Sequence, residues 1–334
     1  MKKSRYPLGA YILAVAVIMF FAACFRTAAL VADFDPASGY FKGKTFITIA
    51  DWSAALAILT SLSYFFTKAS KKKLVATYTD ATTYIPSALV AVATGCLTVK
   101  LFFRLLGAPE SELITVSLTN LLSVGLGAIT VIAFFISCLH TSRRDLTRAG
   151  YQLVAVLFFV VYSAFIYFAN PLPINVPVVI TDVMAYLSVA VFFVYETRIS
   201  LGRDIWGAYC AFGLVAVALL SYSSVPSIIA YFVRGEAFSH SIEENVLTFA
   251  LLLFVLLRLI RATMLFEDGE AQTVRAIKEL EKKAALEKAE ADTEAEEGAS
   301  EDEDAEDDAS EENDNYTFEL EGEDASAQDG EEEE

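Results

Sequence analysis

Four charged residues stand inside long apolar stretches of this 334-residue sequence: Arg26, Asp51, Lys100 and Asp182. A charge surrounded by hydrocarbon is costly, so such residues usually face a polar interior, where they bind an ion or a solute or relay a proton. Two acidic and two basic groups could also neutralise one another. These residue types therefore predict either a polar binding site or a set of structural ion pairs.

Hydroxyl groups gather around Pro226 in another apolar stretch. A proline inside a helix removes one backbone hydrogen bond, and hydroxyls or water can satisfy the carbonyl group that it frees in a membrane. We therefore predict a polar pocket formed by Arg26, Asp51, Lys100, Asp182, Ser223 and Ser224. The alternative is that the basic side chains reach the membrane interface, while the acidic residues begin helices or form structural pairs.

Residues that carry common catalytic chemistry are sparse. The two histidines, His140 and His240, fall in connections on opposite sides of the predicted bundle. The zinc-binding pattern HExxH, which places two histidines on one helix face, is missing. All four cysteines lie in apolar stretches, and none belongs to a Cys-x-x-Cys motif. The sequence therefore predicts no catalytic residue, no cofactor and no metal, and it favours a non-enzymatic protein.

Eight apolar stretches must position the charged residues. A hydrocarbon core of roughly 30 Å is crossed by about 20 helical residues, and continuously apolar runs indicate helices rather than the alternating strands of a membrane barrel. We therefore predict an all-α, polytopic transmembrane helical bundle in residues 1–264. Its eight predicted spans are 8–31, 45–67, 83–106, 113–139, 151–169, 178–197, 205–233 and 246–264. Seven would remain if the first were a cleaved signal peptide, since basic residues before an apolar run also describe one.

Basic residues in alternate connections set the orientation of the bundle. Lys71 and Lys72 follow the second stretch, and Arg143 and Arg144 follow the fourth. Because Lys and Arg in short loops are held on the cytoplasmic side, both termini are predicted to be cytoplasmic. The candidate pocket then lies in the outer third of the bilayer. The pattern fits a bacterial plasma membrane.

The opposite, inner end of the spans contains a second charged group. Glu196 ends the sixth stretch, and Arg258 near the end of the eighth is a possible partner for it. A structural ion pair is the expected use of these residues.

The C-terminal part has a different composition. Residues 265–292 are rich in Ala, Glu, Lys and Leu and predict a cytoplasmic juxtamembrane helix, supported by opposite charges at helical spacing. Residues 290–334 hold 24 of the 43 acidic residues and no Lys or Arg. We therefore predict a disordered acidic tail over 293–334. Its charge repels anionic lipid surfaces and nucleic acid, so neither is an expected partner of the tail.

One apolar cluster interrupts the tail. Tyr316, Phe318 and Leu320 alternate with polar residues, so in an extended strand all three would project from one side and could bind along the sheet edge of a partner. They form a candidate docking peptide for a cytoplasmic protein. The alternative is a chance apolar cluster in a solubilising tail.

The segment 195–203, with the sequence YETRISLGR, follows the sixth apolar stretch. Together with the aromatic-rich spans, it resembles uncharacterised multi-pass membrane proteins of clostridia-type bacteria, and the resemblance implies no activity. Two functions fit the sequence. One is a non-enzymatic sensor, assembly factor or scaffold, embedded in the lipid bilayer, that recruits a cytoplasmic partner through its acidic tail. The alternative is a small-solute transporter with a polar pocket in the outer half of the bundle.

Overall fold

A computed structural model describes most of the apolar part of the chain. The described residues are 7–35, 38–67, 81–107, 113–139, 146–169, 176–201, 205–234 and 241–263. They all belong to one compact unit, Met1–Thr273. The predicted juxtamembrane helix at 265–292, the acidic tail at 293–334 and the docking peptide lie outside the described residues.

Eight helices in this part of the chain are long and apolar enough to cross a membrane, which confirms the predicted all-α polytopic bundle. The labelled elements are α1 (Pro7–Ala32), β1 (Phe34–Asp35), β2 (Tyr40–Phe41), α2 (Thr45–Ser63), the short 3-10 helix η1 (Tyr64–Phe66), α3 (Ala81–Leu106), α4 (Ile114–Leu139), α5 (Leu146–Ala169), α6 (Pro177–Ser200) and α7 (Trp206–Arg234). The last span, Ile242–Thr263, is called the eighth helix here.

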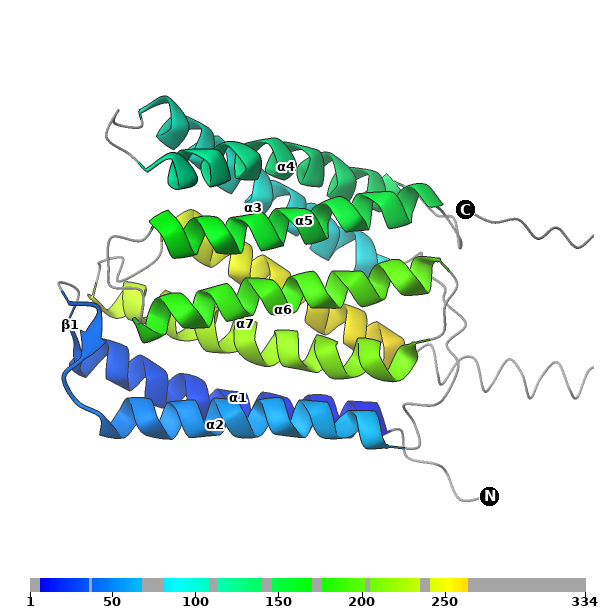
Figure 1. Ribbon diagram of the computed structural model, residues 1–334. Helices are drawn as coiled ribbons and strands as arrows, with labels where there is room; N and C mark the ends of the chain where they lie inside the picture. Colours follow the sequence, from blue (N-terminus) through cyan, green and yellow to red (C-terminus); the bar gives the residue numbers. More distant parts are fainter. Residues whose placement is uncertain are drawn as a thin grey trace, which may run out of the picture. The chain divides into compact units, whose positions relative to one another are not determined.

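A small strand pair connects the first two helices. β1 and β2 pair antiparallel, with Phe34 opposite Phe41. Gly39 has a φ of 73° at the turn between them, a left-handed conformation that glycine adopts without steric cost. Figure 1 shows this strand pair at one end of the bundle. We call that end the hairpin side and the other end the opposite side.

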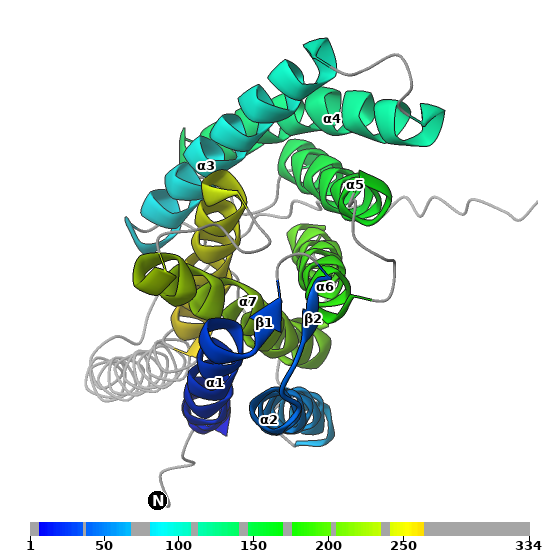
Figure 2. The ribbon, with the colours of Figure 1, turned by 90° about the vertical axis from the view of Figure 1, so that its left-hand side faces the viewer.

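The helices from α3 to α7 pack against one another in chain order, and α7 also packs against both α1 and α2. Figures 1 and 2 show the resulting arrangement, with the eighth helix in yellow among the others. The buried share of the most apolar window is 61% in α7, 56% in the eighth helix and 50% in α6, against 28% in α1 and 22% in α2. The last three helices therefore form the centre of the bundle.

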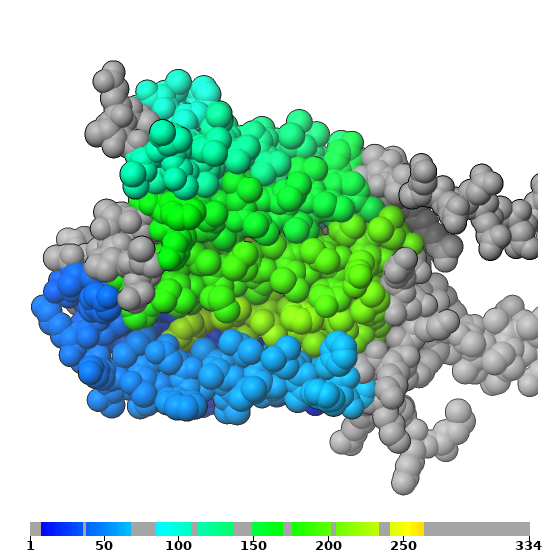
Figure 3. Space-filling view, viewed as in Figure 1, coloured from blue at the N-terminus to red at the C-terminus, as the bar shows by residue number. Residues whose placement is uncertain are grey.

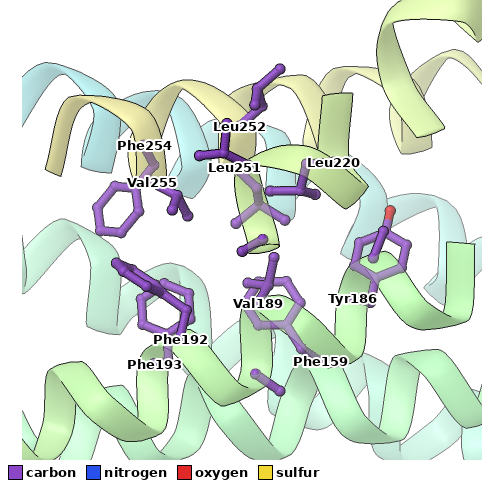
Figure 4. Close-up of a cluster of buried hydrophobic side chains, with 14 of the residues drawn as sticks. Phe159, Tyr186, Val189, Phe192, Phe193, Leu220, Leu251, Leu252, Phe254 and Val255 are labelled. Atoms are coloured by element: carbon purple, nitrogen blue, oxygen red, sulfur yellow. The ribbon is translucent and has the colours of Figure 1, made fainter. Parts of the chain in front are cut away.

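Aromatic and aliphatic side chains fill this centre. Figure 4 shows Leu251 and Phe254 of the eighth helix facing Val189 and Phe193 of α6, and the rings of Phe193 and Phe254 are 5.6 Å apart. On α7, a Cβ atom at Gly213 would lie 2.9 Å from Leu259 of the eighth helix. Glycine thus allows two central helices to approach closely, as small residues commonly do between membrane helices.

The outer surface of the described bundle is apolar. Trp52 of α2 is 74% exposed, and Leu13 and Phe20 of α1 are each 67% exposed. Figure 3 shows α2, in blue, along one edge of the molecule. Because lipid tails are as apolar as these side chains, their exposure is the expected condition of a bilayer-facing surface.

Candidate functional site

Arg26 and Asp51, two of the predicted site residues, meet through a tyrosine. The guanidinium carbon of Arg26, on α1, lies 3.9 Å from the ring centroid of Tyr222 on α7, and Nη1 of Arg26 donates to the hydroxyl of Thr181 on α6 at 3.4 Å. The Tyr222 hydroxyl donates to the carboxylate of Asp51 on α2. Arg26 is only 2% exposed, so its charge is held by an aromatic face, a contact worth about 2 kcal/mol when desolvated.

Asp182 lies beside this group, one residue after Thr181 on α6. Its carboxylate accepts a hydrogen bond from the hydroxyl of Ser223 at 2.6 Å, and both residues are at most 2% exposed. Ser223 follows Tyr222 on α7. Arg26 contacts Thr181 and Tyr222. The next residue on each of those helices, Asp182 and Ser223, forms the neighbouring hydrogen bond, so the two sets of contacts are adjacent.

Glu244 of the eighth helix extends the same set of contacts. Its Oε1 accepts a hydrogen bond from the hydroxyl of Tyr162 on α5 at 3.1 Å. The ring of Tyr162 stands edge-on to that of Tyr186 on α6, with centroids 5.0 Å apart. Tyr186 interacts electrostatically with both Glu244 and Asp182. Glu244 thus bonds to one of two adjoining buried tyrosines, and the hydroxyl of the other, Tyr186, is buried without a hydrogen-bond partner.

The position of Glu244 is fixed by the start of its helix. The backbone N–H of Ser241 donates to Oε2 of Glu244 at 3.0 Å, and the backbone N–H of Glu244 donates to the hydroxyl of Ser241 at 3.4 Å. This reciprocal pair is a capping box, which satisfies free N–H groups at a helix N-terminus. One oxygen of Glu244 therefore holds the helix start while the other holds Tyr162.

We call this set of contacts the polar cluster. It consists of Arg26, Asp51, Tyr162, Thr181, Asp182, Tyr186, Tyr222, Ser223 and Glu244. The acidic and basic side chains of the cluster are three carboxylates and one guanidinium. Among the described residues, no three His, Cys, Asp or Glu side chains are grouped closely enough to hold a metal ion. The arrangement suits a proton or a small organic cation, which hydroxyls and carboxylates can accommodate by hydrogen bonds.

Two of the predicted site residues lie elsewhere. Nζ of Lys100 is 3.3 Å from the carboxylate of Glu243, and both side chains are about 40% exposed. Lys100 therefore pairs on the bundle surface with Glu243, whereas the sequence suggested Asp51 or Asp182 as its partner. Ser224 donates to the backbone carbonyl of Leu220 at 2.7 Å.

Ser227 makes a similar bond to the carbonyl of Ser223, also at 2.7 Å. These hydroxyls serve the backbone of α7 around Pro226, which has no N–H to donate. Of the predicted serines, Ser223 is the one that contacts a charged group of the cluster.

Five members of the polar cluster were not among the predicted pocket residues: Tyr162, Thr181, Tyr186, Tyr222 and Glu244. Tyr222 belongs to the hydroxyl residues that gather around Pro226, and Glu244 was assigned to a connection. The pattern Ser241-x-x-Glu244 before an apolar run was the available signal for Glu244, because it is the sequence signature of a capping box. Nothing comparable marks Tyr162, Thr181 or Tyr186.

On the opposite side, a buried ion pair joins α6 to the eighth helix. Nη2 of Arg258 lies 3.0 Å from Oε1 of Glu196, with exposures of 6% and 0%. The hydroxyl of Ser200 donates to the side-chain oxygen of Gln152 at 2.9 Å nearby on α6 and α5. The expected pairing of Glu196 with Arg258 is confirmed.

The fold defines an integral membrane protein of the multi-pass class, with helices crossing the bilayer in alternate directions. No protein-family model, curated protein or solved structure matches the chain. The polar cluster is therefore the feature of the described residues that points to a function.

Proposed function

We propose that the protein is a small-solute transporter that binds a small cationic solute, or a proton coupled to solute movement, at the polar cluster. The observation that carries the proposal is the carboxylate of Asp182, buried within the span and bonded to Ser223 of a neighbouring helix. Ionisable residues at such depth mark substrate and proton pathways in membrane proteins.

The charge of the cluster supports a cationic ligand. The carboxylates of Asp51, Asp182 and Glu244 come together from three helices, and acidic residues attract cations in cation-selective membrane sites. Asp51 is exposed and lies at the edge of the cluster, whereas Asp182 is buried.

The helix that carries Tyr222 and Ser223 also contains Pro226. Because proline has no N–H, the carbonyl group of Tyr222, four residues earlier, loses its ordinary helical hydrogen bond. Interrupted helices next to a charged site are a common feature of secondary transporters, where they provide ligands and points of bending. Pro226 therefore places a weakened turn of α7 at the cluster itself.

A binding screen followed by a flux assay tests the proposal. The thermal stability of the purified protein would be measured with Na⁺, K⁺, ammonium and a panel of small amines. A ligand at 100 times its Kd stabilises the folded state by about 2.7 kcal/mol. We expect at least one cation to stabilise the native protein and not the Asp182→Asn variant, and we expect proteoliposomes to take up that cation.

The variant Ser224→Ala is the matched control, because Ser224 is adjacent to Ser223 in sequence and its hydroxyl donates to the backbone carbonyl of Leu220 within its own helix. It should keep both stabilisation and uptake. Stabilisation that survives Asp182→Asn would remove the cluster as the binding site. If the cation binds but is not taken up by proteoliposomes, the result would favour a sensor over a transporter.

A second candidate function is a non-enzymatic sensor, assembly factor or scaffold that recruits a cytoplasmic protein. It is favoured by the concentration of acidic residues in 290–334 and by the alternating Tyr316, Phe318 and Leu320. Affinity capture from membranes would compare the full chain with a chain ending at residue 292. This function requires a partner that is lost with the tail and also with the pair Tyr316→Ser and Phe318→Ser.

A further inference from the structure

A groove of about 200 Å³ lies between three helices. Its walls come from α3, from the part of α7 beyond Pro226 and from the first turns of the eighth helix. The lining residues are Leu89, Ile228, Tyr231, Phe232, Ile242, Asn245, Val246 and Phe249. Seven of these eight side chains are aliphatic or aromatic, so the groove is suited to hydrocarbon.

The groove opens on the surface of the bundle and follows its long direction. Phe232 is 79% exposed and Ile242 is 53% exposed. Ile242 begins the eighth helix on the hairpin side, whereas Leu89 belongs to the first half of α3, which starts on the opposite side. Apolar cavities of this size exclude water. An extended acyl chain, entering sideways from the bilayer, matches both the lining and the direction.

Asn245 supplies a polar contact in this apolar wall. The residue is 8% exposed, and its Oδ1 is buried without a hydrogen-bond partner. It lies three residues after Ile242, roughly 4.5 Å into the helix at a rise of 1.5 Å per residue. That depth is close to the membrane interface, where lipid headgroups join their chains.

We propose that the groove binds a bilayer lipid that carries one free hydroxyl group at the junction of headgroup and chains, as diacylglycerol does. The hydroxyl donates to Oδ1 of Asn245, and an acyl chain lies along Val246, Phe249 and Leu89. A buried carbonyl oxygen selects a donor, because an unmatched acceptor is left without its hydrogen bond. A phosphate offers acceptors only and would lose its hydration in this apolar wall.

Fluorescence quenching by brominated lipids tests the proposal on the full chain. The probe protein carries Phe249→Trp, which places a tryptophan in the groove wall, and Trp52→Phe, which removes the exposed tryptophan of α2. Trp206 remains as a buried internal reference. The two quenchers are diacylglycerol and phosphatidylcholine with identical brominated chains, compared in bilayers at equal bromine content.

We expect diacylglycerol to quench the introduced tryptophan at a several-fold lower concentration than phosphatidylcholine. The variant Asn245→Leu, of similar size without an acceptor, should abolish this difference. The control is Asn120→Leu, which removes another buried asparagine on α4 away from the groove-lining residues. It should preserve the difference.

Equal quenching by the two lipids, or a preference that survives Asn245→Leu, would overturn the proposal. Should the probe variant fail to fold, thermal stability of the otherwise unchanged protein decides the matter. Diacylglycerol should then raise the Tm of the native protein above its value in phosphatidylcholine alone. No such rise is expected for Asn245→Leu.

Discussion

The polar cluster and the Glu196–Arg258 pair are two buried charged groups at opposite ends of the same bundle. The pair joins one acid to one base at 3.0 Å between two central helices. The cluster draws residues from six helices, contains more carboxylates than bases, and makes its contacts largely through hydroxyl and aromatic groups.

This difference is the reason for assigning a structural role to the pair and for proposing a binding role for the cluster. A balanced pair is complete without a ligand, and removing one member leaves an isolated charge. An acidic group surrounded by hydroxyls can gain or lose a cation or a proton with less disturbance, because the hydroxyls can reorient. Stability should therefore depend most on the Glu196–Arg258 pair, and ligand binding most on the cluster.

The membrane orientation of the two groups can be tested with an all-or-none result. The test uses a chain whose four cysteines are replaced by alanine. A single cysteine is then introduced either at Ser38 on the hairpin side or at Leu201 at the end of α6, and its labelling is measured in intact and in permeabilised cells. We expect a membrane-impermeant thiol reagent to label Ser38→Cys directly and Leu201→Cys only after permeabilisation. The reverse result would place the cluster on the cytoplasmic side.

The largest change in stability is expected from Glu196→Gln. Loss of one member of a buried pair costs about 3 to 5 kcal/mol, because the charge of Arg258 remains in a low-dielectric interior. Unfolding in detergent measures the cost. The double variant Glu196→Gln with Arg258→Met should recover most of it, and a single-variant cost below about 1 kcal/mol would contradict the structural role.

An intermediate effect is expected from Arg26→Met. The change removes the contact with the Tyr222 ring, worth about 2 kcal/mol for a desolvated cation, and keeps an apolar side chain of similar length. Tyr222→Phe is the comparison, because it preserves the ring and removes only the hydrogen bond to Asp51. Its cost should be about 1 kcal/mol. Equal costs would show that the ring contact adds nothing.

Lys100→Met should have the smallest effect. Lys100 and Glu243 form a partly exposed pair, and such pairs contribute less than about 1 kcal/mol. Any cost should shrink further in high salt, which screens accessible charges. A larger loss of stability, or one that does not change with salt, would indicate that Lys100 interacts with the buried polar cluster and not only with Glu243.

The spans were largely predictable because the thickness of a bilayer fixes how many apolar residues a helix needs. The helix starts were less accurate. The fifth begins at Leu146 and the eighth at Ile242, whereas hydropathy suggested 151 and 246. Helix-starting turns are rich in polar caps, so an apolar count places them in the connection. The two-residue strands β1 and β2 are too short to show an alternating pattern.

The depth of the predicted site residues was also readable, because each helical residue advances a fixed distance along the span. The contact partners of these residues could not be predicted from the sequence. Whether Arg26 meets Asp51, Asp182 or a tyrosine depends on which helices are neighbours, and no sequence pattern reveals that α7 lies against α1 and α2. The contact of Lys100 with Glu243 has the same origin, because both residues lie in the expected layer but on helices whose adjacency was unknown.

The bond from Tyr222 to Asp51 has a consequence for how the protein is made. The two residues are 171 positions apart, so at 5 to 20 residues per second the ribosome needs roughly 10 to 30 s to add the second after the first. During that interval the newborn α1 and α2 hold a cation and an acid in the bilayer before their shared tyrosine has been synthesised. The charges of Arg26 and Asp51 then depend on each other, on interfacial water or on the insertion machinery.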